Sequence, residues 1–420
     1  MMAGPSILSV RKQDEQLTPV LKKRLVSILP ETMRVANIDM WLILCQEDNL
    51  DPVYQTMIPL NTWTPILQML VFSKDSAGKT VEGLNLSMTD TADLYHRPWQ
   101  GRGVDEQWQL LVEIIKQRDP QTIGINIGSV NWAAGGLTHN LYLQLIAVLP
   151  EKYKHRLVTA EPACSHWLMT LTGEELDIMA HAALISKQVI ADCYSPQTIK
   201  PGVTTTTDLE WSYWQKVVDL GLQTCFKPYF NLVRSTVKTA VHPIDDKVIR
   251  AGDMIHCDVG LRYMRLCSDH QEWAYVLEPG ENDAPQGLKA LFTQSARLQK
   301  VFMRSFEHGL SGNQLLSRVL SRAKAENIPN PKVYSHSLGY YLHEPGPLIG
   351  LPWEQTAVPG RGDVVLKPNS CFTMELSIED VVPEWDGQLV RFSTEQDVKF
   401  TDAGCEPFGD VQTGFYLVPG

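Results

Sequence analysis

Five potential metal ligands follow one another in the C-terminal part of the sequence, and each lies in a segment with the residue pattern of a strand or a strand edge. They are Asp258, Asp269, His336, Glu375 and Glu395. Side chains from separate strands can point into one cleft, so residues that are remote in sequence can meet there. Four carboxylates and one imidazole form an oxygen-rich set that suits a pair of divalent metal ions. The pattern indicates metal-assisted hydrolysis.

The charges of these five side chains also favour a pair of metal ions. Four ionised carboxylates would be neutralised by two divalent cations, whereas without metal they would repel one another and some would stay protonated. Two ions about 3.5–4 Å apart lower the pKa of a shared water, give hydroxide near neutral pH and polarise the scissile carbonyl. We therefore predict that bound metal raises the stability of the protein as well as its activity.

The segments around these residues predict an α+β region in which strands carry the ligands and helices lie outside. Three capping pairs predict helix starts, because such side chains satisfy free backbone N–H groups; they are Thr172 with Glu175, Thr207 with Glu210, and Ser311 with Gln314. The first helix is expected to end near Cys193, and another long helix is expected over residues 284–308. The strands that carry the ligands are expected at residues 254–260, 264–277, 371–378 and 389–399.

The N-terminal part alternates between apolar strand runs and helical spacing, which predicts an α/β domain. Strands are expected at residues 40–45, 66–73 and 122–127, and helices at residues 15–36 and 105–117. The second helix should end at Asp119-Pro120, because a proline disfavours helical backbone in the residue before it. The glycines near residues 124–136 form neither a dinucleotide-binding nor a phosphate-loop pattern.

Composition narrows the class of protein and of partner. The formal net charge is −11 and the basic residues form no run, so nucleic acid and anionic membranes are disfavoured as partners. The eight cysteines are scattered without metal-site or disulfide spacing, which favours reduced, buried thiols. The N-terminus lacks an uninterrupted apolar run and no segment is long enough to span a membrane, so a cytoplasmic location is expected.

The order and spacing of the five ligand positions identify a family. Each position lies in a recognisable local motif, namely HCDVG (256–260), CSDH (267–270), SHSLGYYLHE (335–344), CFTMEL (371–376) and RFSTEQDV (391–398). From about residue 170 the chain resembles the pita-bread metallohydrolases, which include aminopeptidase P, prolidase, creatinase and, more distantly, methionine aminopeptidase. The resemblance implies an α/β N-terminal domain (residues 1–165) and a catalytic domain (residues 166–420) with a curved antiparallel sheet covered by helices.

The resemblance also implies roles for the ligands. Asp258 and Glu395 would bridge two divalent ions, Asp269 would complete one site, and His336 with Glu375 would complete the other. Glu375 is also the expected general base. Manganese is the favoured metal, with Fe²⁺, Co²⁺ and Zn²⁺ as alternatives that carboxylate-rich sites also accept.

Further residues are expected to contact the substrate. His343 follows His336 by seven positions, as in the peptidase members, and His242 in TAVHP lies near a substrate-facing histidine of the family. Either imidazole could donate to a developing oxyanion or hold a substrate carboxylate. Tyr340 could line the pocket. Many members carry an arginine two residues before the last ligand, where this chain has Ser393.

Arg391 lies two residues before that slot, and either a strand bulge or a displaced role would explain the offset. Its alternatives are a contact with a substrate carboxylate and a surface ion pair. Other departures from the family are Ser335 and Ser337 in place of glycines, and Leu376 in place of proline. These changes leave the coordinating atoms alone and bear on the choice of substrate.

Three functions remain in competition at this point. The favoured one is a dinuclear-metal exopeptidase that cleaves the X-Pro bond at peptide N-termini or in dipeptides. The second is a non-peptidase enzyme on the same scaffold, either a small-molecule C–N hydrolase or a lyase, since a fold does not determine a reaction. The third is a binding protein that lost catalysis, which the intact ligand set disfavours. The resemblance also implies a homodimer.

Overall fold

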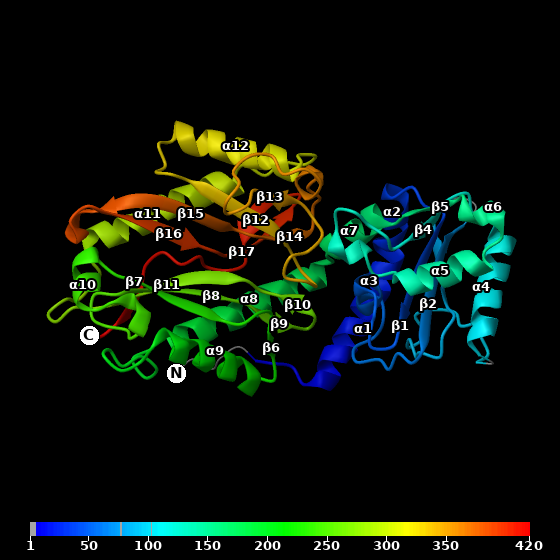
Figure 1. Cartoon of the computed structure of the whole chain (residues 1–420), viewed down its shortest axis with the longest axis horizontal. Helices are drawn as coiled ribbons and strands as arrows, with labels where there is room; N and C mark the ends of the chain where they lie inside the picture. Colours follow the sequence, from blue (N-terminus) through cyan, green and yellow to red (C-terminus); the bar gives the residue numbers. More distant parts are fainter. Residues whose placement is uncertain (1–5, 76–77, 102) are drawn as a thin grey trace. The chain divides into compact units, whose positions relative to one another are not determined.

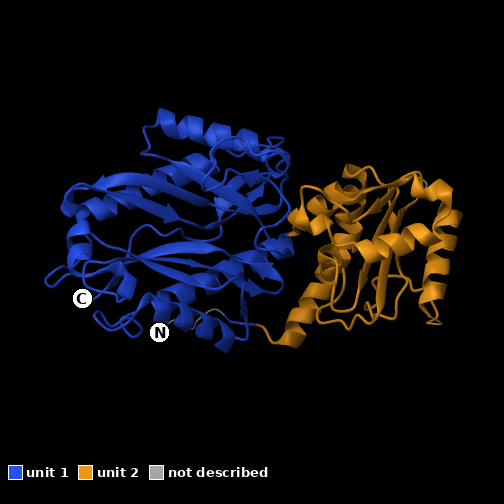
Figure 2. Ribbon diagram, viewed as in Figure 1, with its two compact units in different colours: residues 1–7, 173–420 blue, residues 8–172 orange. Residues whose placement is uncertain are grey.

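The computed structural model describes residues 6–75, 78–101 and 103–420. It divides into two compact units, one of residues 8–172 and one of residues 173–420 together with residues 1–7 (Figure 2). The first five residues, on which part of the N-terminal prediction rests, lie outside the described ranges. Among the residues that the structure describes, no helix is long and apolar enough to cross a membrane.

The unit of residues 8–172 contains one mixed five-stranded sheet in the order β3-β2-β1-β4-β5. Strand β1 (Met40–Gln46) runs parallel to β4 (Ile123–Ile125), which is parallel to β5 (Leu157–Thr159). Strands β2 (Leu67–Lys74) and β3 (Val81–Asn85) add an antiparallel edge. The helices are α1 (Val10–Ser27), α2 (Leu29–Val35), α3 (Pro52–Thr56), α4 (Val104–Arg118), α5 (His139–Val148), α6 (Glu151–Lys154) and α7 (Glu161–Met169). The predicted α/β class is confirmed.

Two local predictions in this unit concern its helices. The expected end of α4 is confirmed, since Asp119 adopts a left-handed conformation (φ 44°) directly before Pro120. The helical pattern over residues 15–36 is confirmed, although it forms two helices, since α1 ends at Ser27 and α2 begins at Leu29. Pro30 lies in the first turn of α2, where a missing backbone N–H is tolerated but where an unbroken helix would lose a hydrogen bond.

The larger unit is built on two main sheets (Figure 1). The smaller sheet has the order β19-β11-β8-β7, and the larger has the order β16-β15-β12-β14-β17-β18, with β13 paired to β12. Their strands are β7 (Tyr229–Val233), β8 (Met254–Val259), β11 (His270–Val276), β12 (Lys332–Leu338), β13 (Leu348–Ile349), β14 (Ser370–Thr373), β15 (Glu375–Val382), β16 (Gln388–Thr394), β17 (Asp397–Thr401), β18 (Gly404–Pro407) and β19 (Tyr416–Val418). All pairings within these sheets are antiparallel except that of β11 with β19.

Helices cover the outer faces of both sheets. Helices α11 (Gln286–Met303) and α12 (Gly312–Ala325) pack on the larger sheet. Helices α8 (Gly173–Cys193) and α9 (Thr206–Asp219) pack on the smaller sheet and on the β6-β9-β10 strands beside it (Figure 1). A continuous apolar core fills the space between the larger sheet and its helices, with Leu298, Phe302 and Phe392 among its buried members. This is the predicted curved antiparallel sheet covered by helices, and that prediction is confirmed.

The helix starts of this unit test the capping predictions. The pair Ser311 and Gln314 forms a reciprocal capping box at the start of α12, as expected. The pair Thr207 and Glu210 is wrong, because Thr205 is the N-cap of α9 and its partner is Asp208. Thr205 has extended backbone (φ −104°, ψ 163°), as an N-cap requires, whereas Thr207 already lies within the helix.

The strand expected over residues 264–277 begins later than predicted. Strand β9 (Leu261–Tyr263) and strand β10 (Leu266–Cys267) form a hairpin in which Met264 and Arg265 make the turn. Both turn residues have positive φ, of 47° and 72°, which is the geometry that two-residue hairpin turns favour. The hairpin also pairs with β6 (Gln223–Thr224) as a small third sheet.

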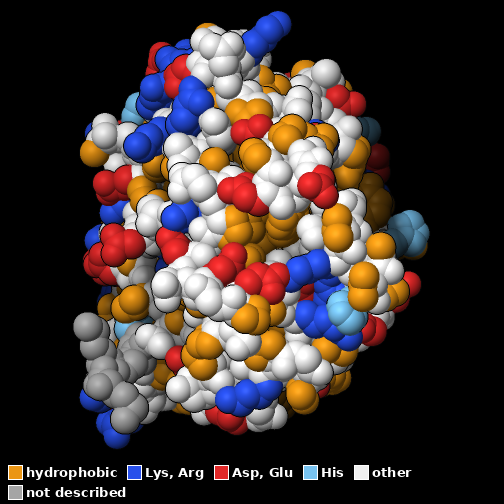
Figure 3. All heavy atoms as spheres, turned by 90° about the vertical axis from the view of Figure 1, so that its left-hand side faces the viewer, with side chains coloured by type: hydrophobic (Ala, Val, Ile, Leu, Met, Phe, Trp, Pro, Cys, Tyr) orange, Lys and Arg blue, Asp and Glu red, His pale blue; other side chains and the backbone are white. Residues whose placement is uncertain are grey.

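Surface charge in the structure follows the scattered pattern of the sequence. On the face shown in Figure 3, Lys and Arg side chains are interspersed with Asp, Glu and apolar side chains. All eight cysteines are free, and six of them are buried.

Candidate metal centre

The proposed ligands lie where the predicted strands are interrupted. Asp269 separates β10 from β11, Glu375 opens β15 one residue after β14 ends, and Glu395 follows the last residue of β16. The segments expected at 371–378 and 389–399 are therefore each two strands rather than one. Interruptions of this kind redirect side chains from the regular alternation of a strand. They let acidic side chains from both sheets converge.

The two main sheets meet at this centre through the backbone. Gln271 in β11 and Glu395 form an isolated antiparallel bridge. The Gln271 N–H donates to the Glu395 carbonyl at 3.1 Å, and the Glu395 N–H donates to the Gln271 carbonyl at 3.2 Å. This pair holds one strand of each sheet at a fixed separation beside the carboxylates.

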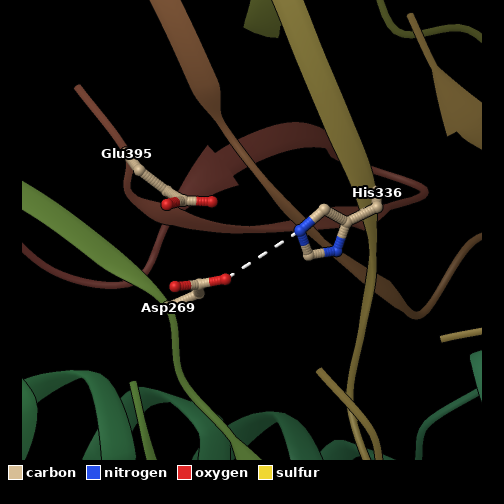
Figure 4. A group of neighbouring side chains, drawn as sticks. All are labelled: Asp269, His336 and Glu395. Carbon is tan, nitrogen blue, oxygen red and sulfur yellow. Dashed lines mark ion pairs between the residues drawn. The ribbon is translucent and has the colours of Figure 1, made fainter. Parts of the chain in front are cut away.

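Three of the five predicted ligands form a compact buried group. Potential ligand atoms of Asp269, His336 and Glu395 all lie within 4.8 Å of one another (Figure 4). The Nε2 atom of His336 is 3.9 Å from Asp269 Oδ2. Asp269 Oδ1 and Glu395 Oε1 are buried, and neither has a hydrogen-bond partner among the described residues. A divalent cation would satisfy both oxygens, so these three residues fit a metal ion.

This grouping changes the expected distribution of ligands. The resemblance placed Asp269 in the site opposite His336, whereas the structure places the two side chains together with Glu395. Asp269 and Glu395 are therefore the two carboxylates that share the His336 site. Asp258 lies in β8 of the smaller sheet and is not part of this group.

The remaining two ligands are joined to this group by Gln271. Its side-chain Nε2 lies 2.9 Å from Glu395 Oε2 and 3.5 Å from Asp258 Oδ2, and the same side chain offsets part of the rise in the pKa of Glu375. Sequence reasoning missed Gln271. No local signal marked it, because Asp269 precedes β11; the pairing of Gln271 with Asp258 across β11 and β8 places these two side chains on one face.

The carboxylates have strongly perturbed acidities. Burial raises the pKa of Asp258 to about 6 and that of Glu375 to about 8. Burial, followed by repulsion from neighbouring carboxylates, raises the pKa values of Asp269 and Glu395 well above their ordinary range. Because a nearby cation favours the ionised form, metal binding would reverse these shifts and release protons.

His336 is oriented for coordination through Nε2. Its Nδ1 lies 3.2 Å from the carbonyl oxygen of Ser337, which accepts a hydrogen bond from the protonated Nδ1, so that the lone pair of Nε2 is on the side of Asp269. Burial lowers the pKa of His336 to about 3, so the ring is neutral at physiological pH. A neutral imidazole is the form that binds metal.

The two further histidines have different environments. The ring of His343 lies 4.4 Å from that of His336, and its side chain is exposed at the rim of the centre. Burial of the ring and the positive charge of Arg361 lower the pKa of His343. His242 lies at the exposed end of α10 (Thr236–Val241), where its carbonyl oxygen accepts from Arg234 Nη1 at 2.5 Å. The role of His242 stays a prediction.

Arg391 lies in a regular strand, which excludes a bulge as the reason for its offset. The pairing of β15 with β16 continues without interruption from Leu376↔Thr394 to Val382↔Gln388. Arg391 and Ser393 therefore point to the same face, and both line a small pocket with Tyr334 and Glu375. Arg391 therefore lines the same pocket as Ser393, which holds the position of the expected arginine two residues along the strand.

The side chain of Tyr340 is buried against α8. Its side chain is 7% exposed, and its hydroxyl donates to a carboxylate oxygen of Glu175 in α8. The pocket-lining prediction for this residue is therefore not carried into the proposed function.

Arg361 is a candidate that sequence reasoning missed. Its Nη2 donates to the carbonyl oxygen of Glu344 at 2.6 Å, while its buried Nε has no hydrogen-bond partner in the described part of the chain. The charge of Arg361 acts on His336, His343 and Tyr334, and burial lowers the pKa of Arg361 itself. The residue lies in a short 3₁₀ turn without a pattern of its own, so nothing local indicated this position.

An oxygen-rich acidic group with one neutral imidazole, built between two curved sheets, defines the class as a metal-dependent hydrolase. Residues 177–402 match the model of metallopeptidase family M24, and this region contains all five predicted ligands. The chain belongs to metallopeptidase family M24.

Individual relatives are distant. The uncharacterised peptidase YqhT of Bacillus subtilis is 22% identical over 286 residues, which are 66% of this chain and 72% of YqhT. The X-Pro aminopeptidase of Thermotoga maritima superposes with a TM-score of 0.65 at 17% identity and covers 92% of this chain and 100% of its own. An Xaa-Pro dipeptidase of Bacillus anthracis gives 0.61 at 17% identity, covering 96% of this chain and 100% of its own. Similarity at this level shows the fold.

Proposed function

We propose that this chain is a divalent-metal-dependent exopeptidase that hydrolyses the bond before proline, at peptide N-termini or in dipeptides. The observation that carries the proposal is the group of Asp269, His336 and Glu395, whose two unpartnered buried oxygens call for a cation. Membership of family M24 supports peptide hydrolysis. The preference for proline rests on the activities of the two solved structures named above.

A bound divalent ion would supply Lewis-acid chemistry and lower the pKa of water. The protein's own groups would handle protons and orientation. Glu375 would serve as the general base, because a nearby cation lowers its raised pKa and leaves the carboxylate ionised. His343 at the rim can donate to the oxygen on which negative charge develops.

Two arginines could bind a carboxylate group of the substrate. Arg361 presents an unpartnered Nε near His343, and Arg391 lines the pocket that contains Glu375. Guanidinium groups bind carboxylates through paired N–H donors, so either could hold the C-terminus of an X-Pro dipeptide. We assign this contact to Arg361, because its side chain is the more buried of the two and charge–charge interactions strengthen with burial.

The proposal is tested with metal-depleted protein reloaded with Mn²⁺. The substrates are an X-Pro dipeptide, a longer X-Pro peptide with an amidated C-terminus, and the same two peptides with alanine in place of proline. We expect release of the first residue from the proline peptides, and a much slower release from the alanine peptides. A His336→Ala variant is the control for contaminating peptidases.

Each other outcome contradicts the proposal in a different way. Bound metal without cleavage of any of the four peptides would favour a C–N hydrolase or lyase on this scaffold. Protein that retains no metal would favour a binding protein. The manganese preference, the homodimer and the cytoplasmic location stay predictions, and light scattering of the purified protein checks the homodimer.

A further inference from the structure

We infer that the centre of this chain holds one divalent ion rather than two, because Gln271 occupies the position between Asp258, Glu375 and Glu395 that a second ion would need. The inference rests on the proposed function, since it concerns the same centre. It replaces the expectation of a metal pair that the ligand types alone supported.

The contacts of Gln271 are those of a substitute for a cation. Its Nε2 carries two N–H donors and no lone pair, and it lies 2.9 Å from Glu395 Oε2 and 3.5 Å from Asp258 Oδ2. The side chain also offsets part of the rise in the pKa of Glu375. Carboxylates that face one another need either a cation or a donor between them, and here an amide supplies the donors.

The other end of this amide contacts His256. Gln271 Oε1 lies 3.1 Å from Nε2 of His256, and the other ring nitrogen of His256 is 3.0 Å from the side chain of Asn231. Once a bound ion has ionised Glu395, its carboxylate only accepts hydrogen bonds, so the NH₂ end of the amide must face it. The His256 ring, packed 4.6 Å from the ring of Trp273, then donates to Oε1.

Gln271 is also poorly able to leave this position. Its residue is 3% exposed, and its backbone N–H and carbonyl both bond to Glu395. Rotating the side chain away would break its hydrogen bonds to His256 and to the carboxylates inside a buried region. Leaving such groups unpaired costs about 1–3 kcal/mol each.

The two sides of the centre differ in whether their carboxylate oxygens have hydrogen-bond partners. Among the five proposed ligands in the described part of the chain, buried oxygens without partners belong to Asp269 (Oδ1) and Glu395 (Oε1), on the side of His336. Glu395 directs its second oxygen, Oε2, to Gln271. This carboxylate is therefore shared between an ion and an amide, where the ligand pattern predicted that it would be shared between two ions.

The experiment measures the number of ions bound to each chain. Metal-free wild-type protein, Gln271→Ala and Gln396→Ala are titrated with Mn²⁺ by calorimetry, and the manganese content of each is measured after gel filtration. Gln396 is the matched control, because it is also a buried glutamine beside Glu395 but donates to Glu272 at 3.3 Å. We expect one ion in the wild type, one in Gln396→Ala and two in Gln271→Ala.

Electron paramagnetic resonance provides a second readout that does not depend on activity, and a second Gln271 variant is available if the first does not fold. Electron paramagnetic resonance of the manganese proteins should show an isolated ion in the wild type and a coupled pair in Gln271→Ala. If that variant does not fold, Gln271→Asn replaces it, since the shorter amide keeps its polarity but withdraws from the carboxylates.

The outcomes separate this inference from the proposed function. Two ions in the wild type would overturn the inference and leave the proposed function in place. No ion in the wild type would overturn both. One ion in the wild type and one in both Gln271 variants would show that Gln271 does not set the number.

Discussion

The two sides of the candidate centre contain similar acids but are completed in different ways. The His336 side consists of Asp269, His336 and the Oε1 oxygen of Glu395, and two of its oxygens are buried without partners. The Gln271 side consists of Asp258, Glu375 and Gln271, and an amide donates to its carboxylates. The difference shows that the number of carboxylates alone does not determine how many cations the centre binds. The hydrogen-bond donors around the carboxylates determine that number.

The supporting residues behind each side also differ. On the His336 side, the backbone N–H of Asp269 donates to Asp397 Oδ1 at 3.1 Å, and burial raises the pKa of Asp397. On the Gln271 side, His256 fixes the amide. Supporting contacts of this kind orient ligands and tune affinity. Supporting contacts therefore hold the ligands on both sides, but only the His336 side holds buried oxygens that have no hydrogen-bond partner in the described part of the chain.

The largest expected effect comes from removing the imidazole of the His336 side. His336→Ala should lose bound metal and reduce kcat/KM by about 1000-fold, because the ion supplies several kcal/mol of stabilisation in the transition state. Asp258→Asn, on the Gln271 side, should keep its ion and lose only about tenfold, since an amide still fits beside Gln271. Steady-state kinetics and metal analysis of both variants check this. Equal losses of metal in the two variants would remove the distinction between the sides.

The next effect is on stability. A ligand at about 100 times its Kd stabilises a protein by about 2.7 kcal/mol, so chelation should lower the Tm by about 5–10 °C for a unit of this size. The two unpartnered oxygens of the His336 side are the reason to expect it. Calorimetric scans with Mn²⁺ and with chelator measure the shift, and His336→Ala is the variant in which both scans should coincide. An unchanged midpoint in the wild type would contradict the prediction.

The arginines extend the comparison to the substrate. Arg361 lies by His336 and His343, and Arg391 lies by Glu375. Arg361→Ala should raise KM for an X-Pro dipeptide by about 10-fold or more, because a buried charge-assisted hydrogen bond contributes about 1.5–3 kcal/mol. The exposed Arg391→Ala should raise it by about 5-fold or less. With an amidated peptide as substrate, neither variant should matter. The opposite ranking would move the carboxylate contact to the Gln271 side.

The smallest expected effect is the pH dependence of the metal-free protein. Folding raises the pKa of Glu375 from 4.5 to about 8, so the native state holds a proton that the unfolded chain loses, and stability falls as pH rises between these values. His336, with its pKa lowered from 6.5 to about 3, acts in the opposite direction below pH 6.5.

The fall should therefore be visible from pH 6.5 to about 8, as a decrease of a few degrees in Tm. Mn²⁺ should abolish it, and Glu375→Gln should flatten it without metal. A metal-free Tm that rises across this range would contradict the pKa shift of Glu375.

Part of this protein could be predicted from local sequence. The capping box of Ser311 with Gln314 and the end of α4 at Asp119 are interactions within a few residues, so the pattern contains all of their physics. The alternation of strands and helices predicted the fold class for the same reason. The types of the proposed ligands were also readable, because a carboxylate or an imidazole carries its coordination chemistry wherever it lies.

The tertiary structure decided what local pattern does not contain. The strand breaks at Asp269, Glu375 and Glu395 depend on pairing between separate segments. The bridge that sets Gln271 beside Glu395 joins residues more than a hundred positions apart. The bond from Tyr340 to Glu175 joins residues 165 positions apart and takes that hydroxyl out of the site. Sequence determined which groups were available for chemistry, whereas long-range hydrogen bonds decided which of them lack a partner, because only the folded chain brings a donor to one acid and withholds it from another.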